Sequence, residues 1–428
     1  MTTLRSVACR VITALALFVA TAATQAGEAQ QRTVVGPSGT EIPYAVYAAE
    51  GTELFIWLPS EAGLLDSEES SAERIAQTGI EVWLVDSFSA HFLPVAESSL
   101  AQVPATDVVT LLGEAVARGK EHVFLVSGGR GVVPLLRGAH AWQSQTGTTT
   151  PIAGAILLSA KFFVETPDPG TPARLYPVVE ATNIPVFLLQ PAQSPWRWKL
   201  GQTVPALERS GSDVFVWVLR GVRDRFYFRP DAVTYEQELG LELPRLVLQA
   251  ARLLGTLPAT RRQAGSLTAA EPAVPVGKKE RALKPYQGEP KAPALALDDL
   301  GGQPRTLAEF RGRVVLVNFW ASWCPPCVHE MPSMQRLKSK LADQPFTILA
   351  VNMAEDAPTV QRFLDTKVNV DFPIVLDSDG ATLKRWQVFA FPTSYVLDKQ
   401  GNIRYALFGA VDWDAPEIVD VITPLLDE

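Results

Sequence analysis

Cysteine is scarce in this chain. Of its 428 residues only three are cysteines, Cys9, Cys324 and Cys327, and only four are histidines. Small secreted proteins held together by disulfide bonds are short and rich in cysteine, so the sequence excludes that class. Basic residues are also outnumbered, because 38 Lys and Arg stand against 46 Asp and Glu, a formal net charge of −8. We therefore expect no nucleic-acid partner.

The apolar run near the N-terminus is shorter than a helix that crosses a membrane needs to be. It covers the thirteen residues Val11–Ala23 and follows two arginines, whereas a spanning helix needs about 20 apolar residues. A basic start, a short apolar run and then small residues predict a signal peptide over residues 1–29, with cleavage near Thr24–Ala26 or Gly27–Ala29. We expect an exported, periplasmic protein; an uncleaved membrane anchor is the alternative.

Composition divides the rest of the chain into two parts. Residues 256–293 contain six prolines and seven Lys or Arg against three Glu. This predicts an extended linker in solvent, and contact with an anionic membrane surface is the alternative for so basic a segment. Residues 30–255 and 294–428, on either side of the linker, are each long enough to form a domain.

The first of these parts alternates between strand-like and helix-like segments. Helical stretches such as 105–117 and 132–142 lie between apolar runs, and a long helix over 235–254 closes the part, with Pro244 kinking or breaking it. This alternation predicts an α/β domain with a parallel sheet covered on both faces. The predicted strands are 54–58, 82–85, 123–126, 155–158, 186–189 and 214–219.

The second part predicts a smaller α/β domain with mixed strand directions. A buried strand over 313–320 precedes a helix that runs from Cys324 to about residue 342. The remaining predicted elements are a strand over 346–352, a helix over 358–366, a hairpin of 394–397 with 403–408, and a last helix over 416–426.

The pair Cys324 and Cys327 directly follows the buried strand. Residues three apart share a helix face, so the two sulfurs can come within disulfide distance. Free N–H groups at a helix start favour a thiolate and lower the pKa of a thiol from about 8.5. The pattern therefore predicts a redox-active pair, with a zinc site or an inert disulfide as alternatives. Zinc needs about four ligands, and His329 is the one histidine in this domain, so we expect no metal and no cofactor.

Residues 294–428 resemble the TlpA/ResA class of exported thiol–disulfide oxidoreductases, over the whole domain. The matching segments are VVLVNFWASWCPPC (314–327), EMP (330–332), AVNMAED (350–356) and FPTSYVLD (391–398). The resemblance implies a thioredoxin fold, a disulfide oxidoreductase activity and no cofactor.

The same resemblance assigns roles to particular residues. Cys324 would be the attacking cysteine and Cys327 the resolving one, and Pro392 would be the cis-proline that faces the disulfide. Glu355 would accept a proton from the resolving thiol, with a solvated loop carboxylate as the alternative. Asn318 occupies the strand position at which ordinary thioredoxins carry a buried Asp, which makes Glu355 more plausible as the acid–base group.

The implied function is reduction of disulfides in envelope proteins, with electrons from a membrane donor of the DsbD/CcdA type. Apocytochrome c, and thus cytochrome c biogenesis, is one substrate class among several that the sequence leaves open. Two alternatives remain: a thiol oxidase, and an envelope scaffold or binding protein with a redox-sensing thioredoxin domain.

The first domain resembles the α/β-hydrolases, and around residues 79–93 it weakly resembles exported VirJ-type proteins of this fold. In the nucleophile elbow G-x-S-x-G the middle residue is the nucleophile. Here the run Ser127–Gly131 follows a strand and has Gly129 at that position. No carboxylate follows the strand at 186–190, and Asp224 lies near the place expected for the histidine. We expect a non-catalytic, hydrolase-like binding module; an active hydrolase with a redox switch is the alternative.

Overall fold

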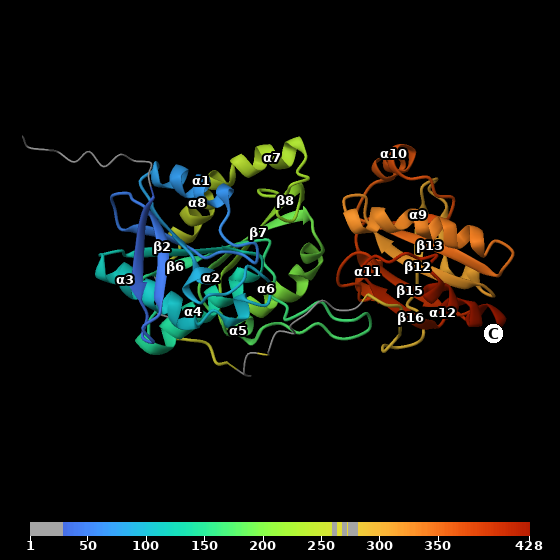
Figure 1. Ribbon diagram of the computed structural model, residues 1–428, viewed down its shortest axis with the longest axis horizontal. Helices are drawn as coiled ribbons and strands as arrows, with labels where there is room; N and C mark the ends of the chain where they lie inside the picture. Colours follow the sequence, from blue (N-terminus) through green and yellow to red (C-terminus); the bar gives the residue numbers. More distant parts are fainter. Residues whose placement is uncertain (1–28, 259–262, 268–271, 273–280) are drawn as a thin grey trace, which may run out of the picture.

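The chain forms two α/β units that lie side by side (Figure 1) in the computed structural model, which describes residues 29–258, 263–267, 272 and 281–428. Nearly all of the predicted signal peptide and much of the predicted linker lie outside these described residues. Within them, no helix combines the length and the apolar character that crossing a membrane requires.

The N-terminal unit is built on one sheet, which among the described residues has eight strands in the order β1-β2-β4-β3-β5-β6-β7-β8. β1 pairs antiparallel with β2, and β2 antiparallel with β4; the other neighbours are parallel. The strands are β1 (Gln30–Val35), β2 (Glu41–Tyr47), β3 (Glu53–Trp57), β4 (Glu81–Val85), β5 (His122–Gly128), β6 (Ile152–Leu158), β7 (Val186–Gln193) and β8 (Val214–Arg223).

Helices cover both faces of this sheet, because its central strands are apolar on both sides. On one face α3 and α4 enclose a core that includes Leu111 and Leu135, and on the other α1 and α8 enclose a core that includes Ile75 and Val247. The helical elements are α1 (Asp66–Ala76), α2 (Ser87–Ala90), η1 (Leu100–Gln102), α3 (Ala105–Ala117), η2 (Gly129–Gly131), α4 (Val132–Thr146), α5 (Pro177–Ala181), η3 (Pro195–Lys199), α6 (Leu200–Glu208), α7 (Thr234–Leu241) and α8 (Leu243–Gly255).

The strands β3 to β8 fall on the six apolar runs that predict strands, but β1 and β2 have no such run. In β2 buried and half-buried residues alternate, a weaker pattern that also suits a loop. The sequence predicts one long closing helix over 235–254, kinked or broken by Pro244. The structure has two helices there, α7 and α8, separated at Glu242. Pro244 lies in the first turn of α8, where its missing N–H group costs no helical hydrogen bond.

The C-terminal unit has a second sheet, which among the described residues has the strand order β11-β10-β14-β13-β12-β15-β16-β9. β12 is parallel to β13 and antiparallel to β15, so strand directions are mixed. The elements are β9 (Lys284–Pro285), β10 (Ala296–Asp299), β11 (Pro304–Thr306), η4 (Leu307–Phe310), β12 (Val314–Trp320), α9 (Pro325–Lys340), β13 (Phe346–Met353), α10 (Ala357–Lys367), β14 (Ile374–Asp377), α11 (Ala381–Arg385), β15 (Thr393–Leu397), β16 (Ile403–Phe408) and α12 (Pro416–Asp427).

The end of the proline-rich segment packs on the C-terminal unit. Leu283 belongs to the core of that unit, and Lys284 and Pro285 pair with β16. Tyr286 continues this contact, because its N–H group donates to the carbonyl of Arg404 at 2.9 Å. Residues 281–286 are therefore anchored to the sheet, while the domain boundaries as a whole stay a prediction.

The contact between α3 and α4 yields a matched pair of substitutions. A Cβ built on Gly138 of α4 would overlap the side chain of Val108 on α3, whereas one built on Gly113 of α3 meets nothing within 4 Å. We expect Gly138→Ala to lower the free energy of unfolding of the N-terminal unit by about 1–3 kcal/mol, because the rigid valine cannot move aside.

In the same protein Gly113→Ala is the control, and it should raise that free energy by roughly 0.5–1 kcal/mol through better helix propensity. Urea unfolding followed by circular dichroism measures both. Equal effects of the two substitutions would contradict this account of the helix packing.

Candidate redox site

The two cysteines lie where β12 ends and α9 begins. Cys324 is the N-cap residue of α9, and its Sγ accepts a hydrogen bond from the N–H group of Cys327 at 3.3 Å. The two sulfurs form a disulfide bond. Cys324 is 5% exposed and Cys327 is fully buried, so Cys324 offers the sulfur that lies closer to solvent. Pro325 and Pro326 occupy the first helical positions, where no N–H group is needed.

Pro392 lies in a loop beside the cysteine loop. The Phe391–Pro392 peptide bond is cis, and Pro392 directly precedes β15. Because Thr393 of β15 pairs with Phe319 of β12, Pro392 lies beside the end of β12 from which the cysteine loop starts. The ring of Phe391 meets the ring of Trp323 edge to face, with centroids 5.8 Å apart. The structure therefore brings the two predicted loops together.

Glu355 contacts the start of the cysteine loop. It follows β13, the parallel neighbour of β12, and is 9% exposed. Its carboxylate accepts hydrogen bonds from the backbone N–H of Ser322 at 2.7 Å, from the Ser322 hydroxyl, and from Nδ2 of Asn352 at 2.8 Å. Ser322 lies two residues before Cys324, so Glu355 holds the loop that carries the attacking cysteine.

A second buried carboxyl, that of Glu330, lies on the same helix as Cys327 and is absent from the predicted site residues. It lies three residues after Cys327 on α9 and is 1% exposed. Nδ2 of Asn318 donates to it at 2.8 Å and Nε1 of Trp413 at 3.0 Å. Burial raises the pKa of Glu330 to about 7, although these two hydrogen bonds oppose the rise.

The sequence held two signals for Glu330. Its spacing from Cys327 places both residues on one face of a helix, and the polar Asn318 interrupts an otherwise apolar strand of VVLVNFW. A polar side chain in a fully buried strand needs partners, and Glu330 is one of them, with the hydroxyl of Ser394 as the other.

The N-terminal unit has a sharp turn after β5 at which Gly129 has a φ of +54°. A Cβ built on Gly129 would overlap the carboxylate of Glu61. That carboxylate accepts a hydrogen bond from the backbone N–H of Arg130 at 2.7 Å and forms an ion pair with Lys161. Burial alone would raise the pKa of Glu61, but Lys161 and the Arg130 N–H lower it to about 2. The space that a side chain at position 129 would need is therefore taken by an ionised carboxylate.

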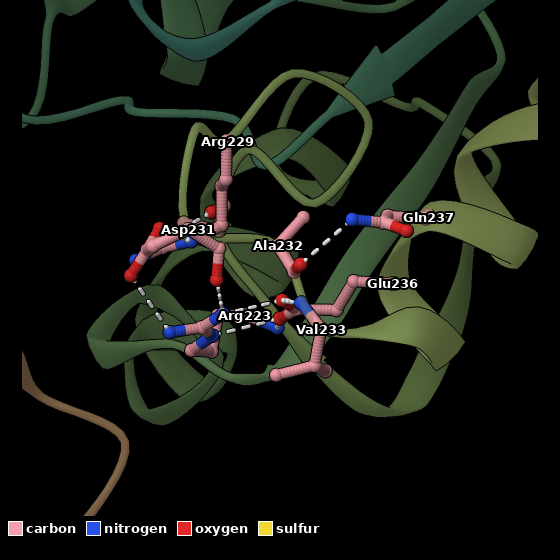
Figure 2. A network of polar contacts seen from close by, with 8 residues as sticks. Arg223, Arg229, Asp231, Ala232, Val233, Glu236 and Gln237 are labelled. Atoms are coloured by element: carbon pink, nitrogen blue, oxygen red, sulfur yellow. Dashed lines mark hydrogen bonds and ion pairs between the residues drawn. The ribbon is translucent and has the colours of Figure 1, made fainter.

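Asp224 follows β8 and is half-buried, with Oδ1 of its carboxyl buried. Burial raises the pKa of its carboxyl to about 6, and a hydrogen bond with Ser194 opposes this rise. The loop that follows is held by ion pairs, which Figure 2 shows. Arg223 donates to Glu236 at 2.8 Å and to Asp231 at 3.1 Å, and Arg229 donates to the carbonyl of Asp224 at 3.0 Å.

Comparison with known proteins identifies the C-terminal unit. The Redoxin family model matches residues 287–422. The thiol-disulfide oxidoreductase ResA of Geobacillus kaustophilus is 37% identical over 120 residues, which are 28% of this chain and 68% of that protein. The thioredoxin-like protein YneN of Bacillus subtilis is 38% identical over 117 residues, which are 27% of this chain and 67% of that protein. Among solved structures, the crystal structure of a secreted thiol-disulfide isomerase from Corynebacterium glutamicum is 27% identical in sequence to this chain, with a TM-score of 0.32. The match covers 36% of this chain and 95% of the isomerase chain.

The C-terminal unit has the thioredoxin fold, and the protein is a thiol–disulfide oxidoreductase. The chain belongs, through this unit, to the family of the ResA thiol–disulfide oxidoreductases. The predicted enzyme class and the predicted fold of the C-terminal domain are thus confirmed.

The raised pKa of Glu330 predicts a pH-dependent stability. The carboxyl has an ordinary pKa of 4.5 and a pKa of about 7 in the folded protein. Its contribution to stability is therefore complete below pH 4.5 and is lost as the pH rises through 7. Relative to Glu330→Gln, the wild type should lose about 3 kcal/mol of unfolding free energy between pH 4.5 and pH 8.

Urea unfolding of the oxidised proteins across this pH range measures the difference. The control is Glu417→Gln, because Glu417 is an exposed glutamate of α12 in the same unit. If the curves of the wild type and Glu330→Gln run parallel, Glu330 does not titrate in this range and the assignment is wrong.

Proposed function

We propose that the protein is an exported disulfide reductase of the cell envelope, with Cys324 and Cys327 as its redox centre. The position of the Cys324 sulfur at the start of α9 carries this proposal. The N–H groups of the first helical turn and the helix dipole favour negative charge there, so the sulfur is suited to react as a thiolate.

In the proposed reaction the Cys324 thiolate attacks one sulfur of a substrate disulfide. The substrate S–S bond breaks, a mixed disulfide forms, and the first substrate sulfur leaves as a thiolate that takes up a proton. Deprotonated Cys327 then attacks Sγ of Cys324, which releases the second substrate sulfur as a thiol. Two electrons and two protons pass to the substrate, and the enzyme is left with the disulfide between Cys324 and Cys327.

The resolving step needs a base, because Cys327 is fully buried. We predicted Glu355 for this role, and its carboxylate binds Ser322 in the cysteine loop. Glu330 is a second candidate, because it follows Cys327 by about one helical turn and its pKa of about 7 suits proton exchange near neutral pH. We assign the proton transfer to Glu330, the positioning of the loop to Glu355, and the substrate-facing position to Pro392.

The proposed direction is reduction, and the resemblance to the TlpA/ResA class supports it. The electrons would come from a membrane donor of the DsbD/CcdA type and go to disulfide-bearing envelope proteins, with apocytochrome c as one such class. Export rests on the sequence pattern of residues 1–29. The competing proposals are a thiol oxidase and a redox-sensing scaffold, which use the same cysteine pair without net reduction of a substrate.

For the N-terminal unit we propose a hydrolase-like fold over residues 30–255 that has lost catalysis, joined by the linker 256–293 to the redox domain 294–428. Its strand order and the tight turn at Gly129 support the likeness to α/β-hydrolases. Glu61 supports the loss of catalysis, because it binds the N–H of Arg130. In active hydrolases of this fold the N–H after the nucleophile stabilises the oxyanion.

A cysteine trap tests the proposed reaction. In reduced Cys327→Ser the attacking thiol remains and the resolving thiol is missing, so mixed disulfides with substrate proteins should accumulate. We expect discrete adducts after incubation with an envelope fraction. They should appear on a non-reducing gel and disappear after treatment with dithiothreitol.

Cys324→Ser is the matched control, because it keeps one thiol of the pair but places it in the buried position. It should give no adducts. If Cys327→Ser traps no more protein than Cys324→Ser, a scaffold or sensor role replaces the proposed enzyme reaction.

A further inference from the structure

The N-terminal unit contacts the redox domain beside the loop that carries Pro392. Phe389, which lies in this loop, is only 6% exposed. Its ring meets the ring of Phe163 at a centroid distance of 5.1 Å and the ring of Trp196 at 5.5 Å, both edge to face. Lys199 adds a cation over the Phe389 ring, with Nζ 4.6 Å from the centroid. We call these four residues the Phe389 contact.

A hydrogen bond and a second tryptophan, Trp198, extend this contact. Nζ of Lys199 donates to the carbonyl of Val388 at 3.1 Å. Trp198 lies so close to Gly380, directly before α11, that a Cβ on this glycine would overlap the indole ring. In Figure 1 the part of the N-terminal unit with α6 and β8 accordingly lies toward α11 of the redox domain. A contact of this kind, with packed aromatic rings and the half-buried ammonium group of Lys199, is typical of a specific interface.

The loops that make the Phe389 contact are held by the altered elbow of the N-terminal unit. Arg130 donates from its guanidinium group to the carbonyls of Phe163 at 3.1 Å and Val164 at 3.2 Å. Its backbone N–H binds Glu61, which also pairs with Lys161 in the same loop as Phe163. The charges that fill the former nucleophile position therefore fix Phe163 for its contact with the redox domain.

The contact lies in the loop that leads to Pro392, the proposed substrate-facing position. Phe389 is followed by Ala390 and by Phe391, whose ring touches Trp323 next to Cys324. Ala390 is itself buried, in one apolar cluster with Phe389 and Phe163. A polypeptide whose disulfide reaches Cys324 must pass close to residues 390–392, and the N-terminal unit closes one end of this strip.

We propose that the N-terminal unit is a wall of the substrate-docking surface of the redox domain, and that the Phe389 contact limits access to Cys324 to disulfides in narrow, extended segments. The inference rests on the proposed role of Cys324 and Cys327. A globular protein would collide with the wall, whereas a small disulfide needs only the exposed edge of Cys324. Trp196 and Lys199 are thus specificity-determining residues that act through Phe389.

The test compares a protein disulfide with a small one in the full-length chain. With dithiothreitol as reductant, we expect Trp196→Ala to raise kcat/KM for insulin at least fivefold, through a lower KM. The rate with glutathione disulfide should stay within twofold. Lys199→Met keeps the apolar bulk of the side chain but removes the cation and the hydrogen bond to Val388. It should also raise kcat/KM for insulin, and it replaces Trp196→Ala as the test if that variant folds poorly.

Trp217→Ala is the control, because Trp217 is a partly exposed tryptophan on β8 outside the Phe389 contact. Three results would contradict the proposal. Trp196→Ala could reduce insulin at the same rate as Trp217→Ala, or more slowly, or its rates with insulin and with glutathione disulfide could change equally. A separate variant tests the proposed function itself. If Cys324→Ser still reduced insulin and glutathione disulfide, the proposed role of the cysteine pair would be wrong, whatever the result for Trp196→Ala.

Discussion

The proposed redox reaction depends on one constraint: a sulfur atom must be able to carry negative charge at the first turn of a helix. The buried strand β12 delivers the chain to that point, and Cys324 caps α9 with its sulfur against the N–H of Cys327. Nearly everything around the pair preserves this arrangement. Pro325 and Pro326 occupy positions that need no N–H group, Glu355 holds the loop through Ser322, and β15 keeps the proline loop next to the end of β12.

Buried carboxyls have opposite roles in the two units. In the redox domain, Glu330 has partners that donate hydrogen bonds and, among the residues that the structure describes, no cation beside it. Burial therefore raises its pKa to about 7, a value suited to proton exchange near neutral pH. In the N-terminal unit Glu61 is also buried, yet Lys161 and the N–H of Arg130 keep it ionised. An ionised and paired group is suited to fixing structure, and Glu61 fixes the loop that reaches Phe389 rather than a reacting substrate.

Local patterns in the sequence predicted the elements that bury continuous apolar runs and the chemistry of the cysteine motif. The runs of β3 to β8 and the strand before Cys324 are of this kind. The pattern could not predict β1, which buries no residue, or β2, which lacks a continuous apolar run. Nor could it predict β9, which contains a proline and pairs with the edge strand β16. Glu330 was missed although its spacing from Cys327 and the polar Asn318 pointed to it, because its contact with Trp413, 83 residues away, leaves no local pattern. The contact of Phe389 with Phe163 and Trp196 joins two domains, and no local pattern reports on it.

The central claim is that Cys324 and Cys327 exchange two electrons as a reductase, and a redox titration of the full-length chain tests it most directly. Thiols are counted by alkylation after equilibration in buffers of fixed potential. We expect one two-electron transition that involves both cysteines, with a potential near the reducing end of the range for such pairs, about −270 mV. A potential near the oxidising end, about −120 mV, or a transition that survives in Cys324→Ser, would contradict it.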